Sequence, residues 1–296
     1  MTASMPARLT SPAFSAYVAP ARGRAQLWRT LLGVILILGI YAGLLALFLL
    51  AIDRWYGPGA ERLLQARSPV GTVLVLATFL GMALGPVLAV VILHRRRPLT
   101  LIGPLRPALR DFCITAGVVL ALSLVWMLLP GGPPLERKLD LGLWFQFLPL
   151  ALLGILVQTG AEELVFRGYL QQQLAARFAT PLAWMVLPSV LFGLLHYDPQ
   201  TMGGNAWLIV AATALFGLIA ADLTARTGTL GAAWGLHLAN NAVALLFISA
   251  EGPLDGLSLW TYPFSQHDVA AMRPLLLLDM AGLVLIWALA RRALRR

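Results

Sequence analysis

The chain consists mostly of long apolar stretches separated by short polar loops. With boundaries good to a few residues, the stretches cover 31–52, 70–94, 112–129, 142–166, 181–197, 206–222, 230–249 and 274–290. A helix needs about 20 apolar residues to cross a bilayer, and helices satisfy their own backbone hydrogen bonds there. The pattern therefore predicts an all-α, polytopic membrane protein with about eight transmembrane helices.

Basic residues predict how this bundle is oriented. They gather before residue 30, in the loop 95–110, around 167–177, at Arg226 and after the last stretch. Loops rich in arginine stay on the cytoplasmic side, so we expect both termini inside. The net charge of +9 is spread over short loops between spans. Nucleic-acid binding needs a clustered, solvated basic face, which this distribution does not provide.

Composition then sets the domain organisation. Only 12% of the residues are charged, against about 25% in a soluble domain, which excludes a soluble enzyme with one anchor. Residues 1–26 are polar, basic and rich in Pro, Ala and Ser, and we expect them to form a disordered cytoplasmic tail. Residues 27–296 are expected to form a single transmembrane domain. The single cysteine, Cys113, excludes an intrachain disulfide and a multi-cysteine zinc site.

Ionisable groups inside membrane spans are costly and usually mark functional sites. Glu162 and Glu163 stand near the end of one stretch, with Arg167 four residues after Glu163. That spacing predicts an ion pair on one helical face. Glu162 points about 100° away on the same helix, so we expect it to lack a local partner. An apolar pocket disfavours its charged form, which suits a general base.

Two histidines stand in later stretches, each with a partner one helical turn away. Phe192 precedes His196 by four residues, so it can pack beside the imidazole, and His237 precedes Asn241 by four. His237 and Asn241 can both donate hydrogen bonds, and fixed donors in a dry pocket suit a developing oxyanion. The structural alternative is hydrogen bonding between helices. Gly231 and Gly235 before His237 have a close-packing spacing.

Depth in the membrane constrains how these residues could meet. Glu162 and His237 lie at similar distances from their basic loops. His196 matches that depth if its helix starts at Pro188, because proline is tolerated at a helix start. Residues 178–187 would then be interfacial, and residues 197–205 would return through the protein interior.

A metal centre is the alternative chemistry that these residue types allow. Glu162, His196 and His237 could form a two-histidine, one-carboxylate zinc site. Their spacing is not that of a known zinc motif, so we expect no metal ion and no other cofactor.

Taken in order, the three patches resemble the CPBP family of intramembrane proteases, which includes CAAX prenyl endopeptidases and bacterial relatives linked to bacteriocin self-immunity. The family pattern of EExxxR, FxxxH and HxxxN or HxxxD reads here as Glu162-Glu163 with Arg167, Phe192 with His196, and His237 with Asn241. The resemblance covers about residues 142–250, which would be the protease core. Because all three motifs are intact, the resemblance implies a glutamate-dependent endopeptidase.

By that resemblance, Glu162 and His196 would activate a water molecule, and His237 and Asn241 would stabilise the oxyanion. Glu163, Arg167 and Phe192 would support the site. We expect a water-filled cavity open to the cytoplasm and a membrane-associated peptide or protein as substrate. The heavy use of arginine and alanine indicates a bacterial source, hence the inner membrane. Two alternatives remain: a non-catalytic scaffold or immunity protein, and a proton-coupled small-solute transporter, although no internal repeat supports the latter.

Overall fold

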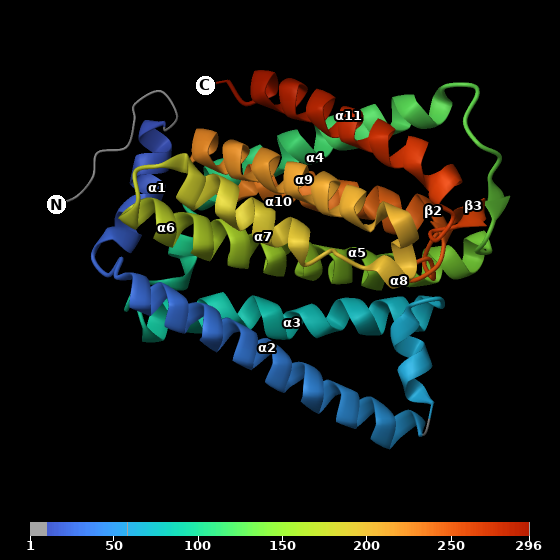
Figure 1. Ribbon diagram of the computed structural model, residues 1–296, viewed down its shortest axis with the longest axis horizontal. Coiled ribbons are helices and arrows are strands. Elements are labelled where there is room, and N and C mark those ends of the chain that lie inside the picture. The colour runs from blue at the N-terminus through green and yellow to red at the C-terminus, as the bar shows by residue number, and fades with distance from the viewer. Residues whose placement is uncertain (1–10, 58, 296) are drawn as a thin grey trace.

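Long helices run side by side along the long axis of the molecule (Figure 1). The computed structural model describes residues 11–57 and 59–295. The helices in chain order are α1 (Pro12–Arg22), α2 (Leu27–Tyr56), α3 (Pro69–Ile92), α4 (Leu105–Leu128), α5 (Leu141–Glu163), α6 (Gln172–Arg177), α7 (Leu187–Leu194), α8 (Pro199–Met202), α9 (Ala206–Thr227), α10 (Gly231–Ala242) and α11 (Val269–Ala293). Wider π-helical turns follow α5 (Leu164–Gln171), precede α7 (Leu182–Val186) and follow α10 (Val243–Phe247).

Six helical segments of the described chain are long and apolar enough to cross a membrane. They are Leu27–Tyr56, Pro69–Ile92, Leu105–Leu128, Leu141–Arg177, Pro199–Thr227 and Val269–Ala293. The segment Leu182–Leu194 is apolar but shorter, and α10 with its π-helical turn ends at Phe247. The predicted all-α polytopic bundle is therefore confirmed. All eight predicted stretches are helical over most of their length, and the two shorter helices carry the motifs with His196 and His237.

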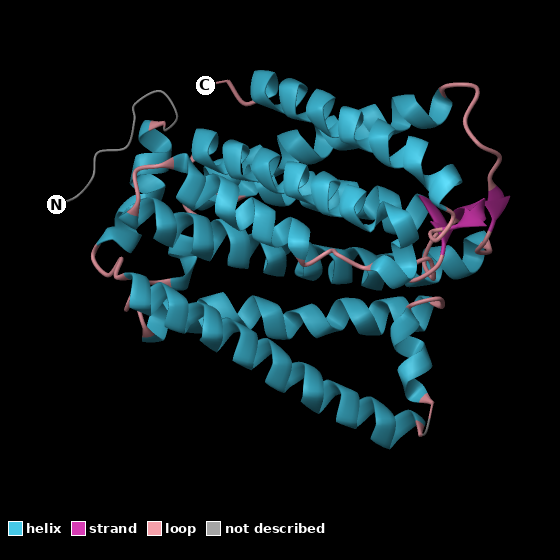
Figure 2. Cartoon of the chain, viewed as in Figure 1, coloured by secondary structure: helices cyan, strands magenta, loops and turns pink. Residues whose placement is uncertain are grey.

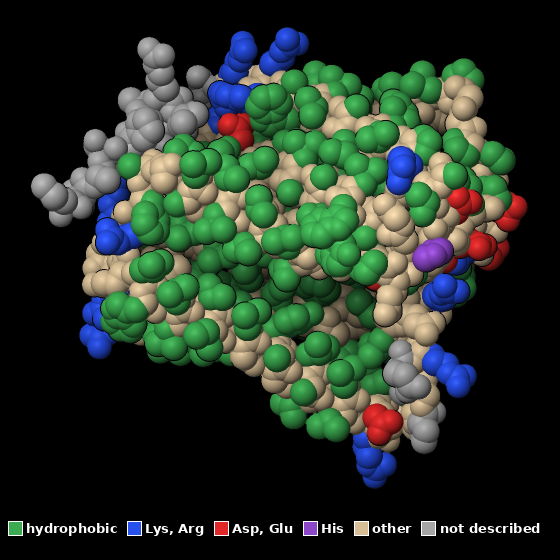
Figure 3. Space-filling model, viewed as in Figure 1, with side chains coloured by type: hydrophobic (Ala, Val, Ile, Leu, Met, Phe, Trp, Pro, Cys, Tyr) green, Lys and Arg blue, Asp and Glu red, His purple; other side chains and the backbone are tan. Residues whose placement is uncertain are grey.

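On the face shown in Figure 3, charged side chains lie mainly toward the two ends, and apolar ones cover the middle. We call the end that holds α1 and the last turn of α11 the termini end (Figure 1). The opposite end, which holds α8 and the β-sheet, is the sheet end (Figure 1). The sides between the two ends expose large apolar residues, as a membrane-embedded surface requires; examples are Leu38, Leu128 and Leu153.

A short three-stranded sheet at the sheet end was not predicted (Figure 2). Its strands are β1 (Glu136–Arg137), β2 (Ile248–Glu251) and β3 (Trp260–Ser265), in the order β1-β3-β2. β1 pairs antiparallel with β3 and β2 pairs parallel with it, with Ile248 opposite Trp260. Strands of two to six residues leave no clear alternating pattern in a sequence. The sheet matters for the site because β2 continues directly from the α10 segment.

Polar residues at predictable places begin and end the long helices. The side chains of Ser68, Asp140 and Asp268 accept hydrogen bonds from backbone N–H groups in the first turns of α3, α5 and α11. Such caps satisfy donors that a helix start leaves unpaired. Gly228 has a φ of 69° after α9, a conformation that favours glycine. The turn at Gly228 sends the chain back into α10.

Close packing of α10 on α4 fixes the helix that carries His237. A Cβ atom at Gly231 would overlap the carbonyl oxygen of Ala108, and one at Gly235 would overlap that of Phe112. Thr115 on α4 donates a hydrogen bond of 2.9 Å to the carbonyl oxygen of Ala232. The predicted glycine spacing is thus used for a close helix approach.

The predicted disordered tail contains a helix. Residues 1–10 lie outside the described residues, but α1 covers much of the remainder, and Phe14 and Val18 on it are 0% exposed. Phe14 packs against Trp184, with ring centroids 5.2 Å apart. The prediction was wrong for residues 12–22. The composition of this segment is typical of a tail, but its apolar residues recur on one helical face.

Tyr17 ties α1 to the rest of the termini end. Its hydroxyl donates a hydrogen bond of 2.5 Å to the carbonyl oxygen of Leu101, and Gln172 donates one of 2.6 Å to the carbonyl oxygen of Tyr17. Burial raises the pKa of Tyr17, so its hydroxyl keeps its proton as a donor.

Tyr17→Phe is expected to destabilise the protein by about 1 to 2 kcal/mol, because a buried carbonyl loses its partner. Thermal unfolding in detergent, followed by tryptophan fluorescence, measures the effect. Tyr41→Phe is the matched control, since the Tyr41 hydroxyl makes no hydrogen bond within the described residues. An equal shift in both variants would contradict the role of Tyr17.

Candidate functional site

The first motif lies where α5 changes into its π-helical turn. Glu163 is the last residue of α5, and Arg167 lies in the turn Leu164–Gln171. Turns of this kind inside α-helices often occur at functional sites. Nη1 of Arg167 lies 2.8 Å from Oε1 of Glu163, so the predicted ion pair is present. Glu163 is 0% exposed and Arg167 is 2% exposed, which makes this a fully buried pair.

His237 lies between the two glutamates. Its Nδ1 is 2.8 Å from Oε1 of Glu163, and its Nε2 is 3.5 Å from Oε2 of Glu162. Oε1 of Glu163 thus faces Nδ1 of His237 and Nη1 of Arg167 together. These two contacts fix the position of the Glu163 carboxylate. The structure therefore brings the first and third motifs into direct contact.

Gln158 extends this network toward Asn241. Its Nε2 donates a hydrogen bond of 2.8 Å to Oε1 of Glu162, and its Oε1 accepts one of 2.9 Å from Nδ2 of Asn241. Sequence reasoning missed Gln158. The signal was available, because Gln158 is a polar residue inside an apolar stretch, four positions before Glu162 on the same helical face.

Glu162 therefore has a local partner, contrary to the prediction. Gln158 occupies its Oε1, while its buried Oε2 has no hydrogen-bond partner within the described residues. The error arose because the prediction considered only the residues that follow Glu162. One carboxylate oxygen is held in place and the other can accept a proton or a hydrogen bond.

Phe192 is the packing centre that connects the three motifs. Its ring lies under the guanidinium of Arg167, with 4.9 Å from the guanidinium carbon to the ring centroid. The rings of Phe192 and His237 meet edge to face with centroids 6.1 Å apart. Phe192 is 3% exposed. A cation above an aromatic ring in a dry pocket is attracted to it, so Phe192 helps to hold Arg167.

His196 stands at the edge of this cluster. Its ring centroid is 4.8 Å from that of Phe192, as the four-residue spacing predicted. Its Nδ1 lies 2.8 Å from the carbonyl oxygen of Phe192. Since a carbonyl only accepts, Nδ1 carries the proton and Nε2 of a neutral ring offers a lone pair. His196 is half-buried and makes no hydrogen bond to the network around Glu162.

The helix before His196 does not start at Pro188. It begins with the π-helical turn Leu182–Val186 and continues into α7. The loop that follows His196 does not return through the interior either, since Tyr197, Asp198 and Gln200 are exposed. The helix continues through Pro188 because a π-helical turn precedes it. The spacing of the residues in the sequence did not predict that turn.

The same side chains do not form a metal site. Within residues 11–57 and 59–295, no three His, Cys, Asp or Glu side chains converge closely enough to hold a metal ion. Glu162 and His237 are close together, but His196 stays apart from them. The three residues of the zinc alternative do not fit one ion in this arrangement.

The geometry has the parts of a hydrolytic centre. It combines a carboxylate oxygen without a hydrogen-bond partner and a nearby carboxamide, with a histidine that has a lone pair at the edge of the cluster. A carboxylate or an imidazole can take a proton from water, and amide donors can bind a developing oxyanion.

Comparisons with known proteins agree with the location of this cluster. Residues 143–243 match the family model of the type II CAAX prenyl endopeptidase Rce1-like proteins. An uncharacterized protein, YyaK of Bacillus subtilis (strain 168), is 34% identical over 110 residues, which is 37% of this chain and 36% of YyaK. The chain thus spans about a third of the length of the curated relative that it matches. No solved structure matches the chain. The stretch 143–243, which contains all three motifs, is therefore similar to the Rce1-like family of type II CAAX prenyl endopeptidases.

Proposed function

We propose that this protein is an intramembrane endopeptidase that hydrolyses a peptide bond of a membrane-associated peptide or protein. The observation that carries the proposal is the contact of His237 with two buried glutamates, one of them paired with Arg167. Such a network is costly inside a membrane and is expected only where it serves a function.

Glu162 and His196 activate the attacking water in this proposal. Oε2 of Glu162 is the carboxylate oxygen without a hydrogen-bond partner, and Nε2 of His196 has the lone pair. The water gives its proton to one of these groups as its oxygen attacks the peptide carbonyl carbon. The proton then moves to the leaving nitrogen as the C–N bond breaks. His196 has to approach Glu162 for both groups to act on one water.

His237 and Asn241 stabilise the oxyanion in the same proposal. Nδ2 of Asn241 uses one N–H on Gln158 and keeps a second N–H. Nδ1 of His237 faces Glu163, so Nε2 is the nitrogen left for the oxyanion, and it donates a hydrogen bond there when the imidazole carries both protons. Glu163, Arg167 and Phe192 are supporting residues, because they hold His237 and the helix ends in place.

The proposal extends to the setting of the protein. The protease core comprises residues 142–250, within one transmembrane domain of residues 27–296. The partners are the lipid bilayer and the substrate, and we place the protein in the bacterial cytoplasmic membrane. A membrane peptide without a prenyl group fits that setting better than a prenylated one.

A cleavage assay in liposomes tests this function. Purified protein is mixed with a library of lipidated and unlipidated membrane peptides, with and without a chelator, and products are identified by mass spectrometry. We expect chelator-resistant cleavage of at least one peptide class. Cleavage that the chelator abolishes and zinc restores would favour the metal alternative, and a lack of cleavage across the library would contradict the proposal.

Gln158→Leu is expected to lower kcat about tenfold to a hundredfold with little change in KM, because Glu162 and Asn241 lose their common partner and shift in position. The same cleavage assay, with initial rates at varied peptide concentration, measures both constants. Thr159→Val is the matched control, since the Thr159 hydroxyl bonds to the carbonyl oxygen of Ile155 in its own helix. An unchanged kcat in Gln158→Leu would remove Gln158 from the site.

A further inference from the structure

Four arginines gather at the termini end, where α2 begins and α3 ends (Figure 1). Arg24 lies in the loop before α2, Arg29 in the first turn of α2, and Arg95 and Arg96 follow α3. The carbonyl oxygen of Arg24 accepts a hydrogen bond of 3.0 Å from Nδ1 of His94. The loop before α2 therefore lies directly against the loop after α3. We call these four residues the arginine cluster.

The charges of this cluster lie close enough to affect one another. Loss of hydration lowers the pKa of Arg24, and the charges of Arg95 and Arg29 lower it further. The pKa of His94 is lowered by burial and also by the charges of Arg96, Arg29 and Arg24. Within the described residues, none of the four arginines forms an ion pair with a carboxylate. The cluster therefore attracts an anion from outside the chain.

Several N–H groups of the two inner arginines have no acceptor. Nη1 of Arg29 donates a hydrogen bond of 2.8 Å to the carbonyl oxygen of Leu93, and Nη1 of Arg96 donates one to Oε1 of Gln172. Nε of Arg29, and Nε and Nη2 of Arg96, are buried and have no hydrogen-bond partner within the described residues. Burial lowers the pKa of Arg96 to about 10, so the guanidinium is still charged at neutral pH. These two arginines thus supply fixed positive charge below the surface.

The two outer arginines present their charge at the surface. Arg95 is exposed and Arg24 is half-buried, and neither side chain makes a hydrogen bond within the described residues. Arg95 has a φ of 51°, and the N–H of Arg96 donates a bond of 3.1 Å back to the carbonyl oxygen of Val90. Glycine usually takes the left-handed position of such a helix-ending turn. An arginine is less stable than glycine in that conformation, which indicates that its side chain has a use there.

Membrane topology accounts for only part of this arrangement. The positive-inside bias requires arginines in a loop, but only for their charge. It does not account for buried guanidinium nitrogens without an acceptor, or for an arginine at a position that favours glycine. A ligand that brings negative charge and acceptor oxygens accounts for both. Phosphate is such a ligand, because its oxygens match the N–H groups of arginine.

Apolar side chains beside the cluster indicate where this phosphate comes from. Trp28, Leu31 and Ile92 are each more than half exposed. The guanidinium carbon of Arg29 lies 4.4 Å from the ring centroid of Trp28, and exposed tryptophans of membrane proteins concentrate at the level of the lipid headgroups. The cluster therefore lies at the depth of the lipid phosphates, with apolar side chains next to it for the acyl chains.

The cluster is also connected to the π-helical turn that holds Arg167. Nε2 of His94 lies 3.0 Å from the hydroxyl of Tyr169, two residues after Arg167 in that turn. Gln172, which accepts the hydrogen bond from Arg96, is the first residue after the turn. A ligand that binds only the folded cluster stabilises the folded protein by mass action, and these contacts include the turn in the stabilised region.

We propose that the arginine cluster binds the phosphate group of an anionic phospholipid from the adjoining leaflet. Arg24 and Arg95 contact the phosphate oxygens, while Arg29 and Arg96 stabilise its charge from below. The acyl chains lie against the exposed apolar side chains at the start of α2 and the end of α3. This lipid site is independent of the proposed peptidase function.

Lipid binding to the purified protein in detergent tests the site. Native mass spectrometry counts the bound molecules as phosphatidylglycerol, or phosphatidylcholine with the same acyl chains, is added. We expect saturable binding of phosphatidylglycerol to the wild type. Binding should be about fivefold weaker in Arg24→Gln and in Arg95→Gly, the usual effect of one arginine on binding to an anionic lipid. Equal binding of the two lipids by the wild type, or unchanged binding in both variants, would overturn the proposal.

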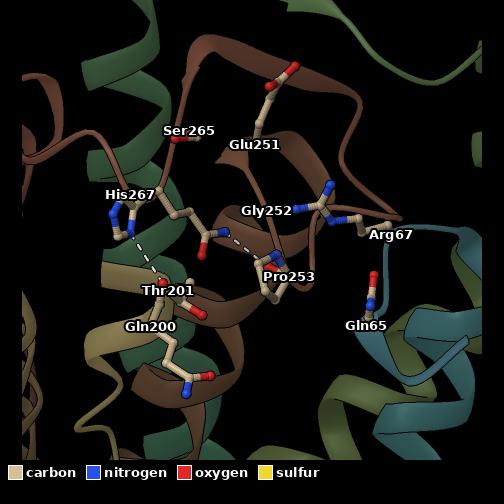
Figure 4. Close-up of a pocket in the computed structure, with 10 residues that line it drawn as sticks. Gln65, Arg67, Gln200, Thr201, Glu251, Gly252, Pro253, Ser265 and His267 are labelled. Carbon is tan, nitrogen blue, oxygen red and sulfur yellow. Dashed lines mark hydrogen bonds between the residues drawn. The ribbon is translucent and has the colours of Figure 1, made fainter. Parts of the chain in front are cut away.

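Arg67→Gln is the matched control, because Arg67 belongs to the opposite end of the bundle. It lines a polar pocket at the sheet end together with Glu251 and His267 (Figure 4), and it makes no hydrogen bond or ion pair within the described residues. No other arginine among the described residues lines this pocket, so Arg67→Gln should leave phosphatidylglycerol binding unchanged. A loss equal to that of the cluster variants would assign the effect to overall charge and overturn the site.

Thermal unfolding separates lost binding from lost folding. Without added lipid, Arg95→Gly is expected to unfold at the same temperature as the wild type or a higher one, because glycine suits a φ of 51°. Phosphatidylglycerol should raise the unfolding temperature of the wild type and of Arg67→Gln more than that of Arg95→Gly. An equal rise in all three proteins would contradict the site. The same rise of the wild type with inorganic phosphate alone would overturn the assignment to a lipid.

Discussion

Glu162→Gln is expected to lower the cleavage rate by about 10³-fold, within the usual range for loss of a general base. Glutamine has the size of glutamate and can still accept the hydrogen bond from Gln158. It cannot take a proton from water. The folded structure should persist, because the ion pair of Glu163 with Arg167 does not involve Glu162.

Initial cleavage rates and thermal unfolding together decide this prediction. Glu136→Gln, the same chemical change at an exposed carboxylate in β1, is the control and should keep wild-type activity. Glu163→Gln provides a contrast, because it leaves the buried charge of Arg167 unpaired and should lose stability as well as activity. Full activity of Glu162→Gln would exclude Glu162 as the base.

Much of the fold could be predicted, because membrane spans carry a strong and simple pattern. Long apolar stretches must be helical in a bilayer, and each of the eight stretches is helical over most of its length here. Short elements escaped prediction for the opposite reason. α1 has eleven residues and β2 has four, too few for a pattern that outweighs a tail-like or loop-like composition.

The site was predictable in its local pairs and less so in its long-range contacts. Four-residue spacing correctly paired Glu163 with Arg167 and Phe192 with His196. The contact of His237 with both glutamates depends on how α10 packs against α5, which no local spacing reveals. The same packing places Gln158 between Glu162 and Asn241. The π-helical turns changed the start of the helix before His196, and such turns have no clear sequence signal.

Arg167→Ala is expected to destabilise the protein by about 3 to 5 kcal/mol, the usual cost of removing one partner from a buried ion pair. Glu163 has no exposure to water, so its charge would lose its main compensation. The variant would also lose the hydrogen bond of 3.3 Å from Nη2 to the carbonyl oxygen of Gly217 and the contact with the ring of Phe192. Thermal unfolding and the yield of folded protein in detergent measure the loss.

Arg291→Ala is the matched control for this prediction. Arg291 also pairs with a carboxylate, that of Asp222 at 3.6 Å, but its side chain is 34% exposed, and exposed pairs contribute only about 0 to 1 kcal/mol. The double variant Arg167→Met with Glu163→Gln should recover much of the lost stability, because it removes both charges from the buried site. The double variant should remain inactive, since position 163 then lacks the carboxylate that contacts Nδ1 of His237. A stable, inactive Arg167→Ala would instead require Arg167 to act on the substrate directly, because a purely supporting role cannot be lost without a loss of stability.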